Sequence, residues 1–242
     1  MNGTVINTHG MDHRTINGLI REAGENVELE GVIGQRFIGA GMTGKDITVG
    51  GIPGNALGAY LNGGGITVLR DAQDAVGDTM NDGMIIVHGN IGDTAGYAMR
   101  GGRIYVRGNA GYRAGIHMKA YKEKVPVLII GGRTGSFLGE YQAGGLIMVL
   151  GLDLDEEDPV GYFPCTGMHG GRMYIRSACE GIVFPEQVNV RKVNGREIQG
   201  IREYVEEYCR IFGLDAGAIL DSEFTEITPD TRNPYRQMYV VN

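Results

Sequence analysis

The sequence predicts an all-β fold, a right-handed parallel β-helix of about eight coils with a short helical C-terminal extension. Three observations lead to this prediction: short apolar triplets recur along the chain, glycines recur with the same spacing, and glycine supplies 42 of the 242 residues. A repeat of about 19 residues is typical of a solenoid, in which one coil cannot bury its own apolar face but a stack of coils can.

The apolar triplets define the expected strands. Each triplet begins and ends with an aliphatic residue or methionine and stands before a glycine or polar turn. Because strand side chains alternate between two faces, the first and third residues are expected to form inward ladders. Crossover chirality favours the right-handed form. The eight triplets are Val27-Glu-Leu29, Ile47-Thr-Val49, Ile66-Thr-Val68, Ile85-Ile-Val87, Ile104-Tyr-Val106, Val127-Leu-Ile129, Ile147-Met-Val149 and Met173-Tyr-Ile175.

The middle residues of the triplets are expected to form an outward column. The column begins with polar residues and becomes large and apolar in the later coils. Its members are Glu28, Thr48, Thr67, Ile86, Tyr105, Leu128, Met148 and Tyr174. A row of large apolar side chains on an outer surface is expected to be covered, either by the chain's own C-terminal part or by another protein.

Glycines punctuate the coils in a G-x-x-G-x-x-x-G pattern. Gly51, Gly54 and Gly58 give one instance, and three later coils repeat it. The stretch "GAGMTGKD" (39–46) lies at the corresponding place of its own coil. It resembles a phosphate-binding loop, but Asp46 stands where that loop needs a hydroxyl, and a strand rather than a helix follows. We therefore interpret its glycines as turn residues.

The irregular intervals and the C-terminal part complete the expected organisation. Insertions at 119–124 and 153–160 are predicted to loop out, either as solvated loops or on a binding face. We expect residues 1–190 to form the β-helix with its entry segment, and 191–242 to form a helical and extended tail that packs on it. Apolar residues from Ile198 to Phe212 have helical spacing before Gly213, 215–222 suit a second short helix, and 224–242 suit an extended tail.

Composition excludes several classes of protein. The net charge is -7 and there is no basic patch, so nucleic acid is not expected as a partner. No apolar run reaches the length of a membrane span, and the N-terminus lacks the apolar segment of a signal peptide. Three widely spaced cysteines do not form a disulfide framework. These features favour a cytoplasmic protein.

Candidate chemical residues are few. Cys165, His169 and Cys179 form the best metal-like group, but a C-x3-H spacing with a distant cysteine is not a strong zinc pattern, and packing roles are favoured over a metal site. His9 and His13 are separated by Gly10, which disfavours a helical metal pair. The sequence therefore predicts no catalytic, cofactor-binding or metal-binding residue on this chain.

The repeats resemble a known family. The stretches at 70–90, 139–151 and 167–175, with the ending "FTEITP" (224–229) and the entry "DHRTINGLI" (12–20), are similar to the GXGXG β-helix domain at the C-terminus of the glutamate synthase large subunit. In that enzyme a glutaminase domain releases ammonia, and an FMN and iron–sulfur domain makes glutamate from 2-oxoglutarate. The β-helix domain acts as a scaffold without catalytic residues.

The resemblance implies a role for this chain. It would be a separate, non-catalytic subunit of an oxidoreductase complex in nitrogen metabolism, would meet glutaminase and FMN/iron–sulfur subunits as partners, and could form a homo-oligomer. FMN and the iron–sulfur cluster would belong to those partners. The alternative is a β-helix subunit of another oxidoreductase complex, such as formylmethanofuran dehydrogenase.

Overall fold

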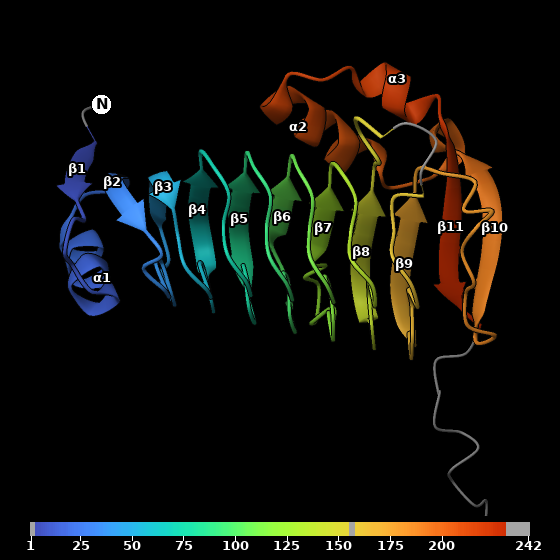
Figure 1. Cartoon of the computed structure of the whole chain (residues 1–242), viewed down its shortest axis with the longest axis horizontal. Helices are drawn as coiled ribbons and strands as arrows, with labels where there is room; N and C mark the ends of the chain where they lie inside the picture. The colour runs from blue at the N-terminus through green and yellow to red at the C-terminus, as the bar shows by residue number, and fades with distance from the viewer. Residues whose placement is uncertain (1–2, 155–157, 231–242) are drawn as a thin grey trace, which may run out of the picture.

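The first nine strands of the described residues run in chain order along one sheet, and each consecutive pair among them is parallel. The computed structural model describes residues 3–154 and 158–230. Figure 1 shows these strands side by side along the long axis of the molecule. They are β1 (Thr4–Asn7), β2 (Asn26–Ile33), β3 (Lys45–Ile52), β4 (Asn62–Val68), β5 (Asp82–Val87), β6 (Arg103–Val106), β7 (Val127–Ile130), β8 (Ala143–Val149) and β9 (Gly170–Ile175). The predicted parallel β-helix is confirmed.

The inward ladders follow the triplets. Ile47 pairs with Ile66, which pairs with Ile85, and Val49 pairs with Val68 in the same register. All of these side chains are buried in one apolar cluster that runs through the solenoid. Burying each such side chain contributes roughly 1.5–3 kcal/mol. The stack of coils therefore has a continuous core along its axis.

The register expected at β7 was wrong by one residue. Ile104 pairs with Leu128 and Val106 pairs with Ile130, so Leu128 points inward and Ile129 takes the place in the outward column that the sequence assigned to Leu128. Residues 127–130 are all aliphatic and all buried, so alternation gave no signal for the register. With Leu128 in the ladder, the interval to Ile147 becomes 19 residues, as in the earlier coils.

The corners of the coils use left-handed backbone. Gly58 has a φ of +64°, and a Cβ placed on it would lie 2.6 Å from Cδ1 of Ile85. A side chain there would displace the core ladder. Gly51 and Gly54 lack room for a different reason, because a Cβ on either would meet the backbone carbonyl groups of the preceding coil. The glycine repeat thus reflects both turn geometry and the close approach of neighbouring coils.

Asp and Asn side chains join neighbouring coils at a second corner. The Asn90 amide N–H donates to Asp71 Oδ1 at 2.7 Å, and the Asn109 N–H donates to Asn90 Oδ1 at 2.9 Å. Three residues further on, the Asp93 N–H donates to Asp74 Oδ1 at 2.9 Å. Short parallel bridges lie beside these contacts and link Ala72, Ile91, Ala110, Thr134 and Val160. The polar side chains therefore satisfy backbone donors that the turns leave unpaired.

A helix closes the N-terminal end of the stack. Helix α1 (His13–Glu22) buries Ile16 and Ile20 against the first coils, and the Asp12 side chain caps it by accepting from the Thr15 N–H at 2.8 Å. The Asn17 side chain donates to the Phe37 carbonyl at 2.8 Å and accepts from the Gly39 N–H at 2.9 Å. The sequence interpretation missed this helix, which covers the open end of the core.

The C-terminal part reverses the direction of the chain. The order is β10 (Val188–Asn194), a short 3-10 turn (Gly195–Glu197), α2 (Arg202–Phe212), α3 (Ala216–Leu220) and β11 (Glu223–Pro229). Strand β11 lies between β9 and β10 and is antiparallel to both.

Two details of this part were predicted and one was not. Gly213 ends α2 with a φ of 68°, as the sequence indicates, and 216–220 form the short helix α3. However, α2 begins only at Arg202, because Gly200 with a φ of +82° separates it from Ile198. Residues 224–229 of the expected extended tail belong to β11, and 231–242 lie outside the described residues. The division at residue 190 stays a prediction.

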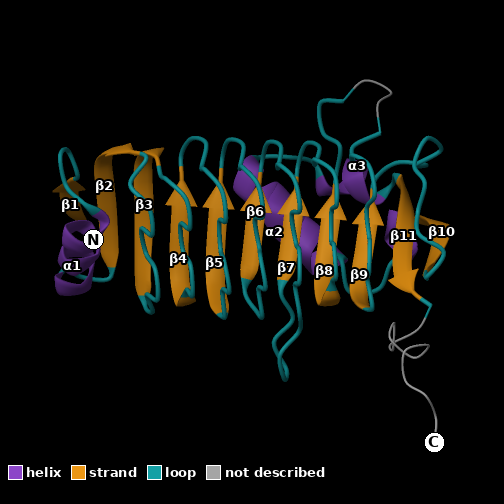
Figure 2. Cartoon of the chain, turned by 60° about the horizontal axis from the view of Figure 1, so that its bottom comes forward, coloured by secondary structure: helices purple, strands orange, loops and turns teal. Residues whose placement is uncertain are grey.

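The insertions extend from opposite edges of the sheet (Figure 2). Residues 119–124 form a small loop before β7, in which Tyr121 and Lys124 pair as an antiparallel bridge. The second insertion, 153–160, follows β8, and its residues 155–157 lie outside the described part of the chain. Among the described residues, the helices are too short or too polar to cross a membrane.

Candidate functional site

The outward column of large side chains is covered by the chain's own C-terminal helices. Tyr105, Ile129, Met148 and Tyr174 are buried in a second apolar cluster, separate from the core of the coils. The residues that α2, α3 and β11 contribute to this cluster are Val205, Tyr208, Cys209, Ile219, Leu220 and Phe224. Of the two covers that the sequence left open, the structure shows the first for this part of the sheet (Figure 1).

A tyrosine–glutamate–arginine contact fixes α2 on the sheet. The Tyr105 hydroxyl donates to Glu207 Oε2 at 2.7 Å, and Arg103 forms an ion pair with the same oxygen at 2.6 Å. Burial raises the pKa of Tyr105, and the neighbouring Glu207 carboxylate raises this pKa further. The phenol therefore stays protonated as a donor. Tyr208 adds a hydrogen bond of 2.9 Å to the Val106 carbonyl.

A second contact of the same composition fixes β11. The Tyr174 hydroxyl donates to Glu226 Oε1 at 2.8 Å, and Arg191 of β10 binds the other carboxylate oxygen. Burial alone would raise the pKa of Glu226, but the hydrogen bonds from Arg191 and Tyr174 outweigh burial and hold this pKa below its ordinary value. The carboxylate thus joins β9, β11 and β10 at the point where the sheet changes from parallel to antiparallel.

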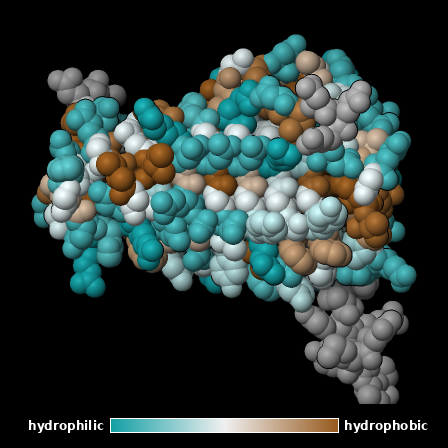
Figure 3. Space-filling view, in the orientation of Figure 1, coloured by the Kyte–Doolittle hydropathy of each residue, from teal (hydrophilic) through white to brown (hydrophobic). Residues whose placement is uncertain are grey.

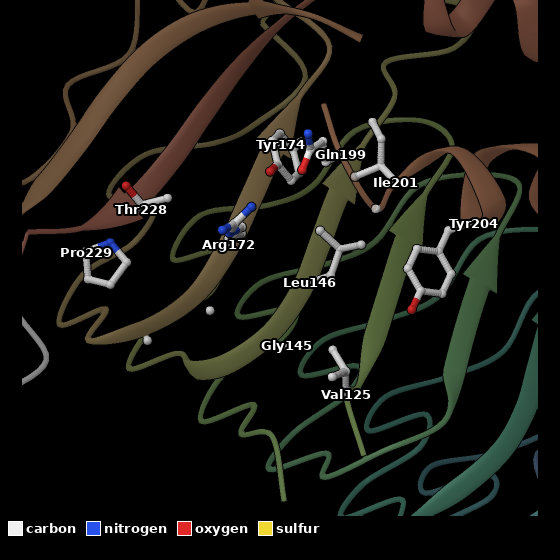
Figure 4. Close-up of a pocket in the computed structure, with 13 residues that line it drawn as sticks. Val125, Gly145, Leu146, Arg172, Tyr174, Gln199, Ile201, Tyr204, Thr228 and Pro229 are labelled. Atoms are coloured by element: carbon white, nitrogen blue, oxygen red, sulfur yellow. The ribbon is translucent and has the colours of Figure 1, made fainter. Parts of the chain in front are cut away.

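A cavity of about 540 Å³ opens beside these contacts, between β8, β9 and the start of α2 (Figure 4). Its lining includes Gly145, Leu146, Arg172, Gln199 and Tyr204. A second cavity of about 440 Å³ lies towards β5 and β6, and Val125 and Tyr204 line both. The two cavities lie side by side on the outer sheet face next to α2.

The side chains that line the larger cavity can bind a ligand or partner but do not form a catalytic group. Among the described residues that line it, Arg172 alone is charged at neutral pH, and none is a histidine, cysteine, aspartate or glutamate. Nucleophilic or acid–base catalysis needs such a side chain within hydrogen-bond reach of a partner. Four charged residues line the smaller cavity: Arg103 is paired with Glu207, Lys124 is paired with Asp82 at 2.8 Å, and Glu123 stands beside them.

The structure does not bring Cys165, His169 and Cys179 together as ligands. Cys165 is buried with its sulfur 3.6 Å from Met173 Sδ, and burial raises the pKa of its thiol. The ring of His169 contacts the Gly167 carbonyl through Nδ1 at 3.0 Å. Across the described ranges, no three His, Cys, Asp or Glu side chains are placed to hold a metal ion. The cysteine positions suit packing roles.

Cys165 also occupies a distinctive corner position. It has a φ of 61° where the preceding coils place Gly115 and Gly139, whose added Cβ would collide with Ile147 and Met173. A side chain fits at residue 165 because the parallel stack ends at β9, and its sulfur contacts Met173 instead.

The "GAGMTGKD" stretch proves to be structural. Lys45 Nζ donates to the carbonyls of Arg21, Ala23 and Gly24, at 3.3, 2.6 and 3.2 Å. These carbonyls belong to the C-terminal end of α1, where a cation is favoured by the helix dipole and by orphan acceptors. Gly39 faces the core, where a Cβ would lie 2.7 Å from Cδ1 of Ile66.

The comparisons with known proteins agree with this geometry. The model of the GXGXG motif family matches residues 7–231, nearly the whole chain.

The chain belongs to the GXGXG family.

A relative of this GXGXG chain is the uncharacterized protein MJ1350 of Methanocaldococcus jannaschii. The two are 41% identical over 253 residues, which cover 99% of this chain and 97% of the relative. A solved structure with a similar fold is a chain of the formyltransferase/hydrolase complex FhcABCD from Methylorubrum extorquens, determined in complex with methylofuran. Its TM-score is 0.62 at 16% identity, and the match covers 95% of this chain and 92% of that chain. At this identity the likeness concerns the fold.

Sequence reasoning missed three sets of functional contacts in the GXGXG chain. The Tyr105–Glu207 and Tyr174–Glu226 contacts join residues that are far apart in sequence, and no local pattern reports them. The third set is the ladder from Asp71 to Asn90 and Asn109, whose members stand 19 residues apart. That spacing was visible in the sequence. It would have revealed the ladder if Asp and Asn had been treated as equivalent, since the side-chain oxygen of either can accept a hydrogen bond from a backbone N–H.

Proposed function

We propose that this GXGXG chain is a non-catalytic scaffold subunit of a multi-subunit glutamate synthase. Partner subunits would carry the glutaminase and the FMN and iron–sulfur chemistry, and this chain would hold them in a fixed relative position. One observation carries the proposal: the conspicuous polar side chains are engaged in holding the fold together. Asp71 and Asp74 bind the next coil, Lys45 binds α1, and Glu207 and Glu226 fasten the C-terminal elements.

The fold suits such a role physically. A continuous apolar core and an inter-coil hydrogen-bond ladder resist bending of a solenoid, so two proteins bound along it would keep a constant separation. The cavities beside α2 are lined by side chains that can bind a partner. The described lining of the larger cavity contains no acid–base pair. Family membership supports the scaffold assignment, since the motif family covers residues 7–231.

A second candidate is a β-helix subunit of another oxidoreductase complex, such as formylmethanofuran dehydrogenase. The observation that favours it is the fold shared with a chain of the formyltransferase/hydrolase complex FhcABCD. The identity of 16% limits that observation to architecture, so glutamate synthase is the first proposal and this complex the second.

Reconstitution tests the proposal. The purified chain is mixed with glutaminase and FMN/iron–sulfur subunits of glutamate synthase encoded by the same genome, and glutamate formation from glutamine and 2-oxoglutarate is measured. We expect no turnover by this chain alone and a higher rate in the mixture when the chain is present. Turnover by the isolated chain would contradict the non-catalytic role, and a mixture whose rate ignores the chain would contradict the scaffold role. In that case, co-purification with formylmethanofuran dehydrogenase subunits would support the second candidate.

A further inference from the structure

Exposed and half-buried aromatic side chains gather at one corner of the later coils. This aromatic corner consists of Tyr97, Tyr112, His117, Phe137, Tyr141, Tyr162 and Phe163. Tyr162 is 79% exposed and Phe163 is 61% exposed. The corner lies on the segments that connect the strands, on the side of the sheet opposite to α2 and α3 (Figure 2). It is therefore separate from the cavities described above.

Backbone strain makes these aromatic residues noteworthy. His117, Phe137, Tyr141 and Phe163 have φ values of 55°, 63°, 53° and 58°, in the left-handed region. Holding a residue with a side chain in this region strains the backbone. In the preceding coils, the same left-handed corner positions hold mostly small residues, namely Ala56, Ala75, Thr79, Thr94 and Ala98, with single aromatic residues at Phe37 and Tyr60. The turn itself does not need an aromatic ring, so folding does not account for the rings.

The rings are also held in a fixed arrangement. His117 stacks on Tyr141 with centroids 5.1 Å apart, and Phe137 stacks on Phe163 at 5.4 Å. Arg113 lies 4.9 Å over the Phe137 ring and pairs with Glu140 at 2.8 Å, which links the two stacks. Tyrosine and arginine are enriched among the residues that dominate binding energy at protein interfaces, and rigid side chains lose little entropy on binding.

The same corner is acidic in the preceding coils. Asp74 and Asp93 occupy the positions that Tyr112 and Tyr162 take later, and Asp78 corresponds to Tyr97. Each carboxylate accepts a hydrogen bond, but none of the three forms an ion pair in the described part of the chain. Arg36 shares this corner but stands two coils before Asp74, about 10 Å along the axis. The aromatic corner therefore borders a strip of uncompensated negative charge.

We infer that the aromatic corner is a docking surface for a partner subunit whose contacting face is apolar at its centre and basic along the edge that meets Asp74, Asp78 and Asp93. This inference rests on the proposed scaffold function. A second copy of this chain fits less well. An isologous dimer needs one patch to supply both charges, but Arg113 of the corner is already paired with Glu140, and the chain carries a net charge of -7.

Binding measurements on full-length variants test the inference. Tyr141→Ala and Tyr162→Ala remove rings of the corner, and Tyr60→Ala is the matched control. Tyr60 has a φ of 58° and is 57% exposed at the same corner position as Tyr141, but lies among the early coils. Affinity for purified glutaminase and FMN/iron–sulfur subunits is measured by calorimetry, with circular dichroism to verify folding. We expect at least tenfold weaker binding to one subunit for each corner variant, and less than twofold change for the control.

The charge strip is tested separately. Asp74→Asn and Asp93→Asn keep the Oδ1 acceptor that the next coil needs, as Asn90 and Asn109 do naturally. They should leave thermal stability unchanged, weaken binding severalfold at low salt, and make the affinity less dependent on salt.

Three other outcomes would contradict the docking inference. If the wild type binds a partner subunit and the corner variants bind it within twofold, another surface docks and the scaffold function stands. If the wild type binds neither subunit, the scaffold function in glutamate synthase fails together with this inference. If sedimentation shows that Tyr141→Ala or Tyr162→Ala dissociates a dimer of this chain, the corner serves self-association and the inference is overturned.

Discussion

The hydroxyl of Tyr105 and the carboxylate of Glu207 lie 2.7 Å apart, although 102 residues separate them in the sequence. This contact joins the outward column of the sheet to the helix that covers it. Tyr105→Phe keeps the ring and removes the donor, so we expect a loss of about 1–2 kcal/mol in the free energy of unfolding. Urea denaturation measures it. Tyr60→Phe, at an exposed ring, is the control and should change stability by less than about 0.5 kcal/mol. Equal effects of the two substitutions would refute the role of the contact.

The inward ladder predicts a sharp contrast between adjacent residues of one strand. Val68 is completely buried, and its neighbour Thr67 lies on the outer face. Val68→Asp places an unpaired charge in the core and should cost more than about 4 kcal/mol or prevent folding. Thr67→Asp should cost less than about 1 kcal/mol. Thermal unfolding of both variants measures the difference, and similar melting temperatures would exclude the proposed alternation.

Two glycines with the same backbone conformation separate turn strain from steric clash. Gly58 and Gly44 have φ values of +64° and +62°, but an added Cβ meets Ile85 at Gly58 and nothing within 4 Å at Gly44. Both alanine variants pay about 1–2 kcal/mol for left-handed backbone. Gly58→Ala should lose a further amount of about 1–3 kcal/mol, because the core must shift. A difference of less than about 0.5 kcal/mol between the variants, measured in urea, would mean that the core accommodates the methyl group.

We expect Lys45 to contribute to the stability of the fold and not to bind nucleotides. Lys45→Met keeps much of the side chain and removes three hydrogen bonds to the end of α1, so we expect a loss of about 0.5–2 kcal/mol. Equilibrium unfolding measures the loss. Calorimetry with ATP and with a dinucleotide should detect no binding to the wild type, and binding that Lys45→Met abolishes would restore the phosphate-loop interpretation.

The buried thiol of Cys209 leads us to expect a lower free energy of unfolding at alkaline pH. Burial raises the pKa of its thiol from 9.0 to about 11. Because the unfolded thiol ionises first, the contribution of Cys209 is fully present below pH 9 and declines as the pH rises from 9 to about 11. Unfolding free energies of the wild type and of Cys209→Ala at pH 8, 9, 10 and 11 isolate this effect. The gap between the two proteins should narrow with pH, and a constant gap would contradict the shifted pKa.

The periodicity of the sequence was sufficient to predict the strands, but not the register of β7 or the helix that covers the N-terminal end. Ile47, Ile66 and Ile85 alternate with polar or outward residues, so their register follows from sequence alone. At Leu128 the neighbours are equally apolar on both sides, and only pairing with Ile104 resolves the direction of the side chain. Helix α1 has sequence signals of its own, the capping Asp12 and an apolar stripe of Ile16, Leu19 and Ile20, but the repeat does not include it. Its role depends on the open end of the core that it covers.

The candidate site was harder to predict than the fold. Leu146 and Arg172 of the cavity beside α2 are neighbours across β8 and β9, but Tyr204 joins them only after the chain has reversed through β10. The aromatic corner was accessible in principle, since His117 and Tyr141, and likewise Phe137 and Phe163, fall at equivalent places of successive coils. Their meaning depended on backbone conformation, which periodicity does not report: left-handed φ values at exposed rings.

The closed ends of this solenoid have an evolutionary consequence. Because α1 seals one end and the antiparallel β10 and β11 finish the other, the number of coils between them is not dictated by either terminus. Duplicating or deleting one 19-residue unit around β4 or β5 would preserve every rung contact and change the length by about 4.8 Å. The length of such a molecule can therefore change in fixed steps while both of its end structures stay the same.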